Sequence, residues 1–311
     1  MARHYGIPYM GSKQKLVDKI VPFILKRHPD TTHFYDLFGG GGSVSLYAVR
    51  KYPNLNVHYN ELSLAISSLM EHLKEGGEIP FDFYTKDEFE SMREGSDWHT
   101  GLMQVCWTFG NNTKHYLYAR SIQDFKHKLH DLVMTGQGNF GELEALSDKL
   151  NLQEWGKEVN TKIYLNPAIY DTPYRRRIVL ARQIPNLGAM QHIGRLERLV
   201  QISNMPGISN LIITKGKSYD QVPINQTKSV VYCDPPYEAT AEYAEGNFSS
   251  KQFYDWVAEQ KVPVYFSSYK ISDDRFKLVK AINTRSLLNQ HSRKDSPHNY
   301  ENLYWNGVGD A

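Results

Sequence analysis

Residues 32–43 read Thr-His-Phe-Tyr-Asp-Leu-Phe-Gly-Gly-Gly-Gly-Ser, a β-favouring stretch that runs directly into four consecutive glycines. Apolar residues then recur at helical spacing from Val44 to Val49. A strand, a glycine turn and a helix in this order form the opening half of a βαβ nucleotide-binding unit. Glycine lets the backbone approach a ligand closely and adopt positive φ. The stretch therefore predicts an open α/β sheet with a ligand site after its first strand.

A second strand is predicted over residues 56–59, and it ends in Asn60 and Glu61. Glu61 follows the glycines by about 20 positions, where an acid meets a ribose hydroxyl in dinucleotide-binding folds. The third glycine of G-x-G-x-x-G is missing, so adenosine with an amino-acid tail fits the pattern better than a pyrophosphate. Asp36 precedes the turn and is placed to pair with the ammonium group of such a tail. The alternative is a glycine-rich loop without a ligand.

A third apolar stretch, residues 230–237, reads Val-Val-Tyr-Cys-Asp-Pro-Pro-Tyr. Pro235 and Pro236 cannot extend a strand, because each lacks an N–H and fixes φ. Asp234 is therefore expected at the carboxyl end of a buried strand, which is where open α/β sheets bind ligands. Its carboxylate and the Pro235 carbonyl would accept the two N–H bonds of an exocyclic amine and expose its lone pair. The face of Tyr237 would stack on the attached ring; a turn with a buried tyrosine is the alternative.

Composition indicates a water-soluble globular protein with one large domain and an inserted lobe. The chain has 311 residues, of which 41% are hydrophobic and 23% charged. No stretch approaches the roughly 20 apolar residues that cross a bilayer, and the amino terminus lacks a signal-peptide core, so we expect a cytoplasmic protein. Cys106 and Cys233 lie in apolar strings and are expected to be buried thiols. No zinc-like spacing occurs, and the net charge of +2 neither demands nor excludes nucleic acid.

Residues 7–13, Ile-Pro-Tyr-Met-Gly-Ser-Lys, precede a helical pattern over residues 16–24. Ser12 is a suitable N-cap for that helix. Lys13 would then occupy the first turn, where the helix dipole disfavours a cation. A ligand carboxylate or phosphate would explain this lysine; a solvated surface position is the alternative.

From residue 79 to about 207 the strand–helix alternation is lost, and aromatic, polar and basic residues mix. A helix end near residue 109 followed by a Gly-Asn-Asn turn, a helix over 121–133 and another over 191–202 are predicted. The candidate contacts to nucleic-acid bases and phosphates in this region are Asn111, Asn112, Lys114, Arg120, Tyr174, Arg175, Arg176 and Arg177. For the three consecutive arginines, a solvated helix start competes with a phosphate contact.

The remainder of the chain returns to the main sheet. Strands are predicted over 211–214 and 262–267, a helix over 247–260, and a terminal hairpin over 282–288 and 302–305. The polar loop between the last two strands carries Arg293 and Lys294. It is either a disordered tip or a basic finger on a nucleic-acid backbone.

Together these stretches resemble the Dam-like DNA adenine-N6 methyltransferases. The family's aromatic-x-Gly-Gly-Lys segment is similar to Tyr9-Met10-Gly11-Ser12-Lys13, and its Phe-x-Gly-x-Gly loop to Phe38-Gly39-Gly40-Gly41-Gly42. Asp-Pro-Pro-Tyr is the family's catalytic motif and stands here at residues 234–237. A segment like Tyr-Gly-x-Asn, here Phe109 to Asn112, belongs to the family's recognition lobe.

The resemblance implies the following assignments. S-adenosylmethionine would be the cofactor, held by Tyr9, Met10, Gly11, Ser12, Lys13, Asp36, Phe38, Gly39, Gly40, Gly41, Asn60, Glu61, Ser218, Tyr219 and Asp234. Asp234, Pro235, Pro236 and Tyr237 would be catalytic. The substrate would be a flipped adenine in double-stranded DNA, with a cognate restriction endonuclease as a further partner and with neither metal nor membrane involved.

The fold implied is a Rossmann-like methyltransferase sheet, residues 1–79 and 206–311, with a mostly helical DNA-recognition lobe inserted over 80–205. The sequence departs from the family where an aspartate usually ends the second strand, because Asn60 stands there with Glu61 beside it. Three alternatives keep part of the pattern: an RNA or protein-glutamine methyltransferase, a catalytically inactive DNA-binding relative, and an NAD-dependent oxidoreductase. The last leaves Asp-Pro-Pro-Tyr unexplained.

Overall fold

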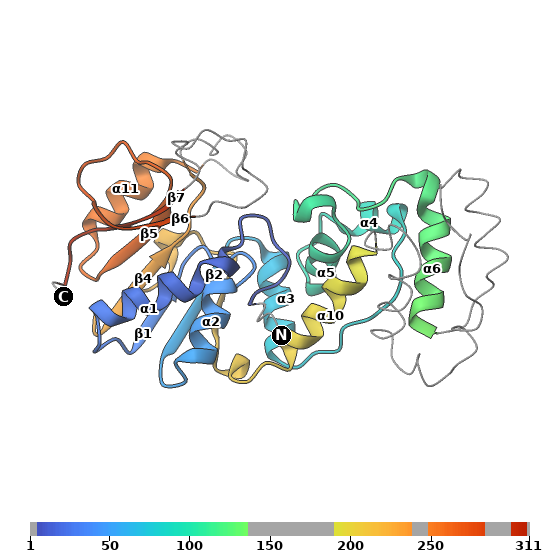
Figure 1. Cartoon of the computed structure of the whole chain (residues 1–311), viewed down its shortest axis with the longest axis horizontal. Helices are drawn as coiled ribbons and strands as arrows, with labels where there is room; N and C mark the ends of the chain where they lie inside the picture. Colours follow the sequence, from blue (N-terminus) through green and yellow to red (C-terminus); the bar gives the residue numbers. More distant parts are fainter. Residues whose placement is uncertain (1–4, 136–189, 238–247, 284–299, 310–311) are drawn as a thin grey trace.

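A computed structural model gives the fold of the chain, and it describes residues 5–135, 190–237, 248–283 and 300–309. Seven strands form one sheet in the order β3-β2-β1-β4-β5-β7-β6 (Figure 1). The strands are β1 (His33–Asp36), β2 (Asn56–Glu61), β3 (Ile212–Lys215), β4 (Ser229–Cys233), β5 (Val264–Ser268), β6 (Lys277–Asn283) and β7 (Tyr300–Trp305).

The sheet is parallel except for β7, which pairs antiparallel with both β5 and β6. Strand order reverses between the neighbours β1 and β4: the strands that follow β1 in the chain, β2 and β3, lie on one side of this pair, and β5 lies on the other. Such a switch point opens a crevice at the carboxyl ends of the strands. The glycine run follows β1 and Asp234 follows β4, so the topology brings the two sequence motifs to the same edge. This sheet fits the predicted Rossmann-like methyltransferase fold.

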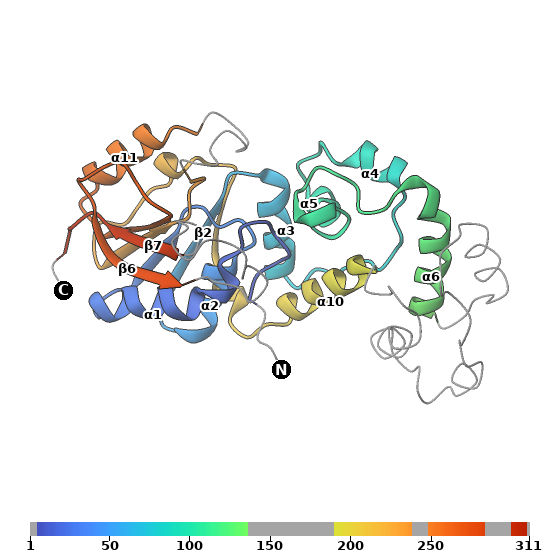
Figure 2. The ribbon, with the colours of Figure 1, turned by 45° about the horizontal axis from the view of Figure 1, so that its top comes forward.

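The central strand β4 is buried on both faces, which explains its unbroken apolar sequence. Val230 and Tyr232 pack in the cluster that contains α1 (Val17–Arg27), α2 (Ser43–Lys51) and α3 (Leu64–Lys74), whereas Val231 and Cys233 pack against α11 (Ser250–Glu259) on the opposite face. Figure 2 shows α1 and α2 on one side of the strands and α11 on the other. Cys106 and Cys233 are both buried free thiols, as predicted.

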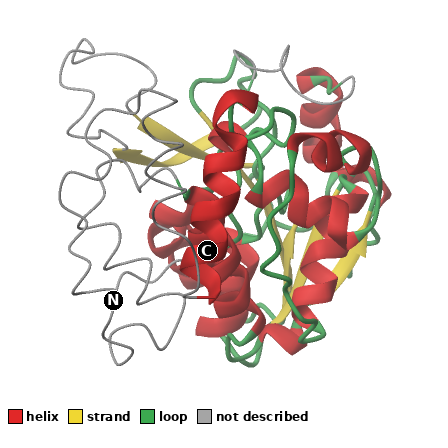
Figure 3. Cartoon of the chain, turned by 90° about the vertical axis from the view of Figure 1, so that its right-hand side faces the viewer, coloured by secondary structure: helices red, strands yellow, loops and turns green. Residues whose placement is uncertain are grey.

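The described α-helices are α1 (Val17–Arg27), α2 (Ser43–Lys51), α3 (Leu64–Lys74), α4 (Lys86–Met92), α5 (Trp98–Cys106), α6 (Gln123–Thr135), α10 (Gln191–Ser203) and α11 (Ser250–Glu259). Helices α4, α5, α6 and α10 gather beyond α3, away from the sheet (Figure 1). Figure 3, viewed from that end, shows helices and loops in front of the strands. No helix in the described ranges is long and apolar enough to cross a membrane.

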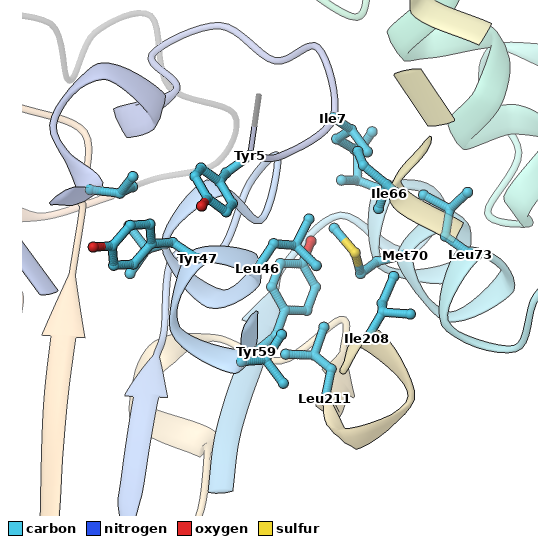
Figure 4. Packing of buried hydrophobic residues seen from close by; sticks show 14 of the residues in the cluster. Tyr5, Ile7, Leu46, Tyr47, Tyr59, Ile66, Met70, Leu73, Ile208 and Leu211 are labelled. Atoms are coloured by element: carbon cyan, nitrogen blue, oxygen red, sulfur yellow. The ribbon is translucent and has the colours of Figure 1, made fainter. Parts of the chain in front are cut away.

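Helix α3 joins the helical region to the sheet. A Cβ on Gly101 of α5 would lie 2.3 Å from the carbonyl oxygen of Ala65 on α3, so only glycine permits this close helix crossing. On its other side, Met70 of α3 points towards Leu46 of α2 and towards Ile208 (Figure 4). The hydrophobic core is therefore continuous from the sheet through α3 into the helical region.

Three features differ from the sequence-based expectation. Helix α3 was not anticipated, because its apolar residues directly follow a strand and share one long pattern with it. Strand β6 begins at Lys277 and the described part ends at Asn283, upstream of the predicted 282–288. Ser12 precedes a short 3₁₀ helix, η1 (Lys13–Lys15), but its side chain makes no capping hydrogen bond.

Candidate active site

The glycine loop after β1 is fastened to the end of β2 by three hydrogen bonds. The Gly39 amide donates to the Asn60 carbonyl over 2.8 Å, and the Gly40 amide donates to the Glu61 carboxylate over 2.7 Å. The Tyr59 hydroxyl donates to the Gly40 carbonyl over 2.8 Å. A Cβ on Gly39 would lie 2.2 Å from the Tyr59 ring, so no larger residue fits there. The loop therefore has one fixed shape, with Glu61 beneath it.

Asn60 and Glu61 occupy different environments at the end of β2. The Asn60 side-chain amide donates to the carbonyls of Leu37 and Lys217, so it connects the ends of neighbouring strands. The side-chain oxygen of Asn60, Oδ1, is buried without a hydrogen-bond partner among the described residues. Glu61 accepts from the amides of Gly40 and Ser63 at 2.7 and 2.9 Å. These two amides fix the orientation of the Glu61 carboxylate beside the glycine loop.

Asp36, at the end of β1, lies below the loop and is 1% exposed. Its Oδ2 accepts from both the amide and the hydroxyl of Ser45, at 3.2 and 2.7 Å, which fixes the first turn of α2. Burial raises the pKa of Asp36 to about 7 in spite of the Ser45 hydrogen bonds. The contacts of Asp36 are thus structural, and its pairing with a cofactor ammonium group stays a prediction.

An aromatic group lines the other side of the same edge. The Tyr219 ring stacks on Phe38, with ring centroids 5.4 Å apart, and it meets Phe253 and Trp256 edge-on. Burial raises the pKa of Tyr219 to about 12, so its hydroxyl is protonated at neutral pH. Ser218 begins the 3₁₀ turn that holds Tyr219 in place. A planar base would find an apolar wall here.

The amino-terminal segment packs across the glycine loop. The Ile7 amide donates to the Gly41 carbonyl over 2.8 Å, and the Tyr9 ring lies where a Cβ on Gly40 would approach within 3.1 Å of it. Met10 is 65% exposed, and Gly11 and Ser12 are exposed as well. Lys13 instead turns inward and is 8% exposed. The surface alternative for Lys13 is therefore excluded.

The inward ammonium group of Lys13 meets two carboxylates. Its Nζ lies 2.6 Å from Oδ2 of Asp234 and 3.4 Å from Oε1 of Glu301, which belongs to β7. The Tyr237 hydroxyl donates to Glu301 and reaches Oδ1 of Asp234 at 3.3 Å. These four side chains, Lys13, Asp234, Tyr237 and Glu301, are called the edge cluster below.

The edge cluster has perturbed proton affinities. Burial raises the pKa of Asp234 to about 6; the Lys13 ammonium opposes the rise, and the Glu301 carboxylate adds to it. Burial acts to lower the pKa of Lys13, but the two carboxylates outweigh burial and the pKa is raised. Lys13 is therefore charged at neutral pH, and Asp234 titrates close to the physiological range. Perturbed groups of this kind collect at functional sites.

Tyr237 is held by the cluster and by a second aromatic ring. Lys13 Nζ lies 5.2 Å from the centroid of the Tyr237 ring, and Tyr269 meets that ring edge-on with centroids 4.7 Å apart. Burial, followed by the charges of Asp234 and Glu301, raises the pKa of the Tyr237 hydroxyl. The Tyr237 ring is half-buried, which agrees both with a tyrosine packed in the core and with a ring that stacks on a base.

Glu301 was missed by the sequence interpretation, which began the last strand at residue 302. The available signal was an acid in a short segment rich in aromatic residues, Tyr300–Trp305. Its spacing from residues 234–237 is more than 60 positions, so no local pattern connects it with Asp-Pro-Pro-Tyr. Only the insertion of β7 beside β5 brings it there.

The helical region approaches the sheet across a cavity of about 310 Å³. Tyr9, Ser63 and Ile66 line it from the sheet side, and Arg93, Glu94, Gln104, Thr113, Lys114 and His115 line it from the other. The predicted Gly-Asn-Asn turn is the tip of a hairpin in which Thr108 and Tyr116 form an antiparallel bridge. Asn112 holds this tip, because its side-chain oxygen accepts from the amides of Lys114 and His115 at 3.0 Å each.

The other predicted DNA contacts have mixed outcomes. Asn111 adopts positive φ in the hairpin tip, and Lys114 is exposed beside the cavity. Arg120 forms an exposed ion pair with Asp87. Tyr174, Arg175, Arg176, Arg177, Arg293 and Lys294 lie outside the described residues. Among the described residues, no group of three or more metal-ligating side chains is arranged to hold an ion.

Comparison with protein-family models gives a match for the amino-terminal part of the chain. Residues 9–129 match the model of the D12 class N6 adenine-specific DNA methyltransferases. The matched segment contains Lys13, the glycine loop, Glu61 and the hairpin tip, while Asp234 and Glu301 lie beyond it. A comparison with curated proteins found no match. The family match over residues 9–129, together with a sheet that fits the methyltransferase fold, supports the resemblance of this chain to the Dam-like, D12 class DNA adenine-N6 methyltransferases.

Proposed function

We propose that the protein uses S-adenosylmethionine to methylate the N6 amine of an adenine that is flipped out of duplex DNA. The observation that carries this proposal is the position of Asp234. Its carboxylate follows β4 at the switch point, beside the glycine loop of β1, and it is buried enough to have a pKa of about 6. An ionised acid at this edge is suited to accept an N–H of the target amine.

The residues around the glycine loop fit the cofactor. Glu61 is the acid beside the glycine loop that would accept from ribose hydroxyls, and its two backbone donors already fix its orientation. We therefore assign the ribose to Glu61 and a structural role to Asn60, whose amide is spent on two strand-end carbonyls. Phe38 and Tyr219 supply the apolar wall for the adenine of the cofactor, and Tyr9 closes the loop from the opposite side.

S-adenosylmethionine would supply an electrophilic sulfonium methyl group to the N6 amine, which would leave S-adenosylhomocysteine and release one proton from the methylated nitrogen to solvent. Asp234 orients the amine and stabilises the positive charge that develops on nitrogen. Holding both reactants in line converts a bimolecular step into an effectively unimolecular one. Tyr237 would offset part of the unstacking cost of the flipped base, since base stacking contributes about 1–3 kcal/mol.

The proposed organisation is a catalytic domain of residues 1–79 and 206–311 and a recognition lobe of 80–205. The cavity between α3 and the hairpin tip supports it, because Lys114 and His115 face Tyr9 and Ser63 across that space. DNA held along the lobe would present a flipped base towards the sheet edge. The family resemblance also implies a partner, a cognate restriction endonuclease encoded beside the methyltransferase gene.

The test is methyl incorporation from tritiated S-adenosylmethionine into duplex DNA, RNA and protein in parallel. The expected result is label in DNA alone, at N6-methyladenine within one sequence context. Long-read sequencing of DNA from cells that express the protein would locate that context. Label in RNA or in protein glutamine would favour the alternative substrates, and DNA binding without label would favour an inactive relative.

A further inference from the structure

The edge cluster contains two carboxylates for one cation. Lys13 comes from η1, Asp234 from the turn after β4, and Glu301 from β7, so three distant segments converge on one ammonium group. Glu301 is 5% exposed and Lys13 is 8% exposed. Buried charges are costly unless they are paired, so this excess of negative charge calls for a reason.

Lys13 occupies the place that the target amine requires. Its Nζ lies 2.6 Å from Asp234 Oδ2, which is the distance of a charge-assisted hydrogen bond. A carboxylate oxygen can accept from two donors, but the ammonium group on this oxygen withdraws negative charge from it and so weakens it as an acceptor for an amine in the cleft. A looser contact between Lys13 and Asp234 would therefore strengthen the carboxylate as the group that orients the substrate.

Glu301 is the second partner within reach of Lys13. Its Oε1 lies 3.4 Å from Lys13 Nζ, and a movement of well under 1 Å would bring that distance to the roughly 2.8 Å of a charge-assisted bond. The Tyr237 hydroxyl also donates to Oε1 of Glu301, the oxygen that lies near Lys13, and this bond holds the carboxylate in the cluster. The ammonium group would thus remain paired throughout the exchange.

We propose that Glu301 is a positioning residue that takes the Lys13 ammonium from Asp234 when the target amine arrives. The exchange leaves Asp234 Oδ2 to the amine and keeps one net negative charge beside the nitrogen that becomes positive. Glu301 does not touch the substrate in this scheme; it acts through Lys13 and Tyr237. The inference rests on the proposed function, because it assigns the target amine to Asp234.

The principal test is Glu301→Gln, assayed on plasmid DNA from cells that lack adenine methylation, with tritiated S-adenosylmethionine at saturation. A glutamine oxygen can still accept from Tyr237, so the variant removes the charge and keeps that hydrogen bond. Lys13 then has Asp234 as its one charged partner in the cluster. We expect kcat to fall about tenfold to a hundredfold, with the Kd for S-adenosylhomocysteine changed by less than about threefold. Glu259→Gln, on the exposed last turn of α11, is the matched control.

The pH dependence of kcat distinguishes the proposed role of Glu301 from a merely structural one, because a structural role would not shift the acid limb of the profile. Among the described residues, the titratable groups that interact with Asp234 are Lys13 from η1, Glu301 from β7, Tyr237 on its own turn, Tyr232 and Cys233 from β4, and Asp36 from β1. Glu301 raises the pKa of Asp234, so its neutralisation should shift the acid limb of kcat to lower pH by roughly half a unit or more. General loosening of the site would lower the plateau without that shift.

A double-mutant cycle with Lys13→Met separates an action through Lys13 from an independent one. If Glu301 works by receiving Lys13, its neutralisation matters little once Lys13 is gone, so the double variant should have a kcat within about threefold of Lys13→Met alone. Additive losses would overturn the proposal. If Glu301→Gln does not fold, Glu301→Asp carries the test: reduced kcat with unchanged cofactor affinity supports the proposal, and wild-type kcat overturns it.

The two levels of inference fail in different ways. If the wild-type protein labels no DNA, the proposed function is wrong. If the wild type labels DNA and Glu301→Gln matches it in kcat and in acid limb, the role of Glu301 is wrong and the function stands.

Discussion

Two buried polar networks in this protein are built on opposite principles. The edge cluster is charged and unbalanced, with two acids against one lysine. The second network lies in the helical region and is neutral: the Tyr118 hydroxyl contacts Nδ1 of His192 at 2.6 Å, and Nε2 of His192 contacts Nδ1 of His130 at 2.9 Å. Nε2 of His130 then contacts the Phe81 carbonyl at 2.8 Å.

The proton positions of this histidine chain follow from its last member. A backbone carbonyl can only accept, so Nε2 of His130 donates to Phe81. A neutral His130 then accepts at Nδ1, which makes His192 Nε2 a donor and His192 Nδ1 an acceptor for the Tyr118 hydroxyl. Every donor in the chain has a matching acceptor. Burial lowers the pKa of His130, which favours the same neutral state.

The difference between the networks shows how one fold uses buried polarity for two purposes. The histidine chain joins α6, α10 and the segment after α3, and its completeness makes it a structural device. The edge cluster has one more negative than positive charge, at the edge of the sheet where the proposed ligands bind. Local rules tend to be broken where function requires it. Four predictions test this contrast, in order of decreasing expected effect.

Asp234→Ala should remove almost all methyl transfer, about a thousandfold or more in kcat, because the orienting acceptor and its charge are both lost. The melting temperature should change little, since the variant also removes the excess charge. Filter binding should show DNA affinity within about threefold of the wild type. Retained turnover would break the assignment of the edge cluster as the catalytic site.

His192→Ala should have the opposite profile. The side chain is 0% exposed, and its loss leaves the Tyr118 hydroxyl and His130 Nδ1 unpaired beside a cavity. We expect the free energy of unfolding to fall by about 3–5 kcal/mol, measured by urea denaturation at pH 7.5. His115→Ala, at an exposed position, is the control. A loss of less than about 1 kcal/mol would show that the chain is not a structural device.

Acidification should affect both networks, for different reasons. Asp234 has a pKa of about 6, so methyl transfer should fall about tenfold per pH unit below that value as the acceptor becomes protonated.

The folded-state pKa of His130 is lowered, so the unfolded chain binds a proton first. The contribution of neutral His130 to stability is therefore fully present above about pH 6.5 and is lost below it, by at most about 1.4 kcal/mol per unit; the raised pKa values of Asp36 and Asp234 act in the opposite direction. Initial rates and urea midpoints from pH 5 to 8 would separate the two effects; a rate independent of pH contradicts the first.

Arg120→Ala should have the smallest effect on the fold. Arg120 and Asp87 are 64% and 72% exposed, and such an ion pair contributes about 0–1 kcal/mol. If Arg120 contacts a DNA phosphate as predicted, the slope of log affinity against log salt should decrease by about one. Fluorescence anisotropy at several salt concentrations measures that slope, and an unchanged value would leave Arg120 to its partner Asp87.

Local sequence patterns were sufficient for the parts of the site that depend on neighbouring residues. The glycine turn after β1, the strand that ends on Asp234 and the acid at the end of β2 are each contained within a few positions. Chain direction and the rule that parallel strands end at one edge then bring them together. The family resemblance rested on the same segments, and the match over residues 9–129 confirmed it.

Other features depended on contacts between residues far apart in the chain, where no periodicity carries a signal. Glu301 reaches Lys13 and Tyr237 only because β7 inserts antiparallel between β5 and β6. The different environments of Asn60 and Glu61 follow from hydrogen bonds to three other segments. The sequence alone determined which chemical groups end the strands; tertiary structure decided which charges share a buried site, because strand order and burial set both their distances and their proton affinities.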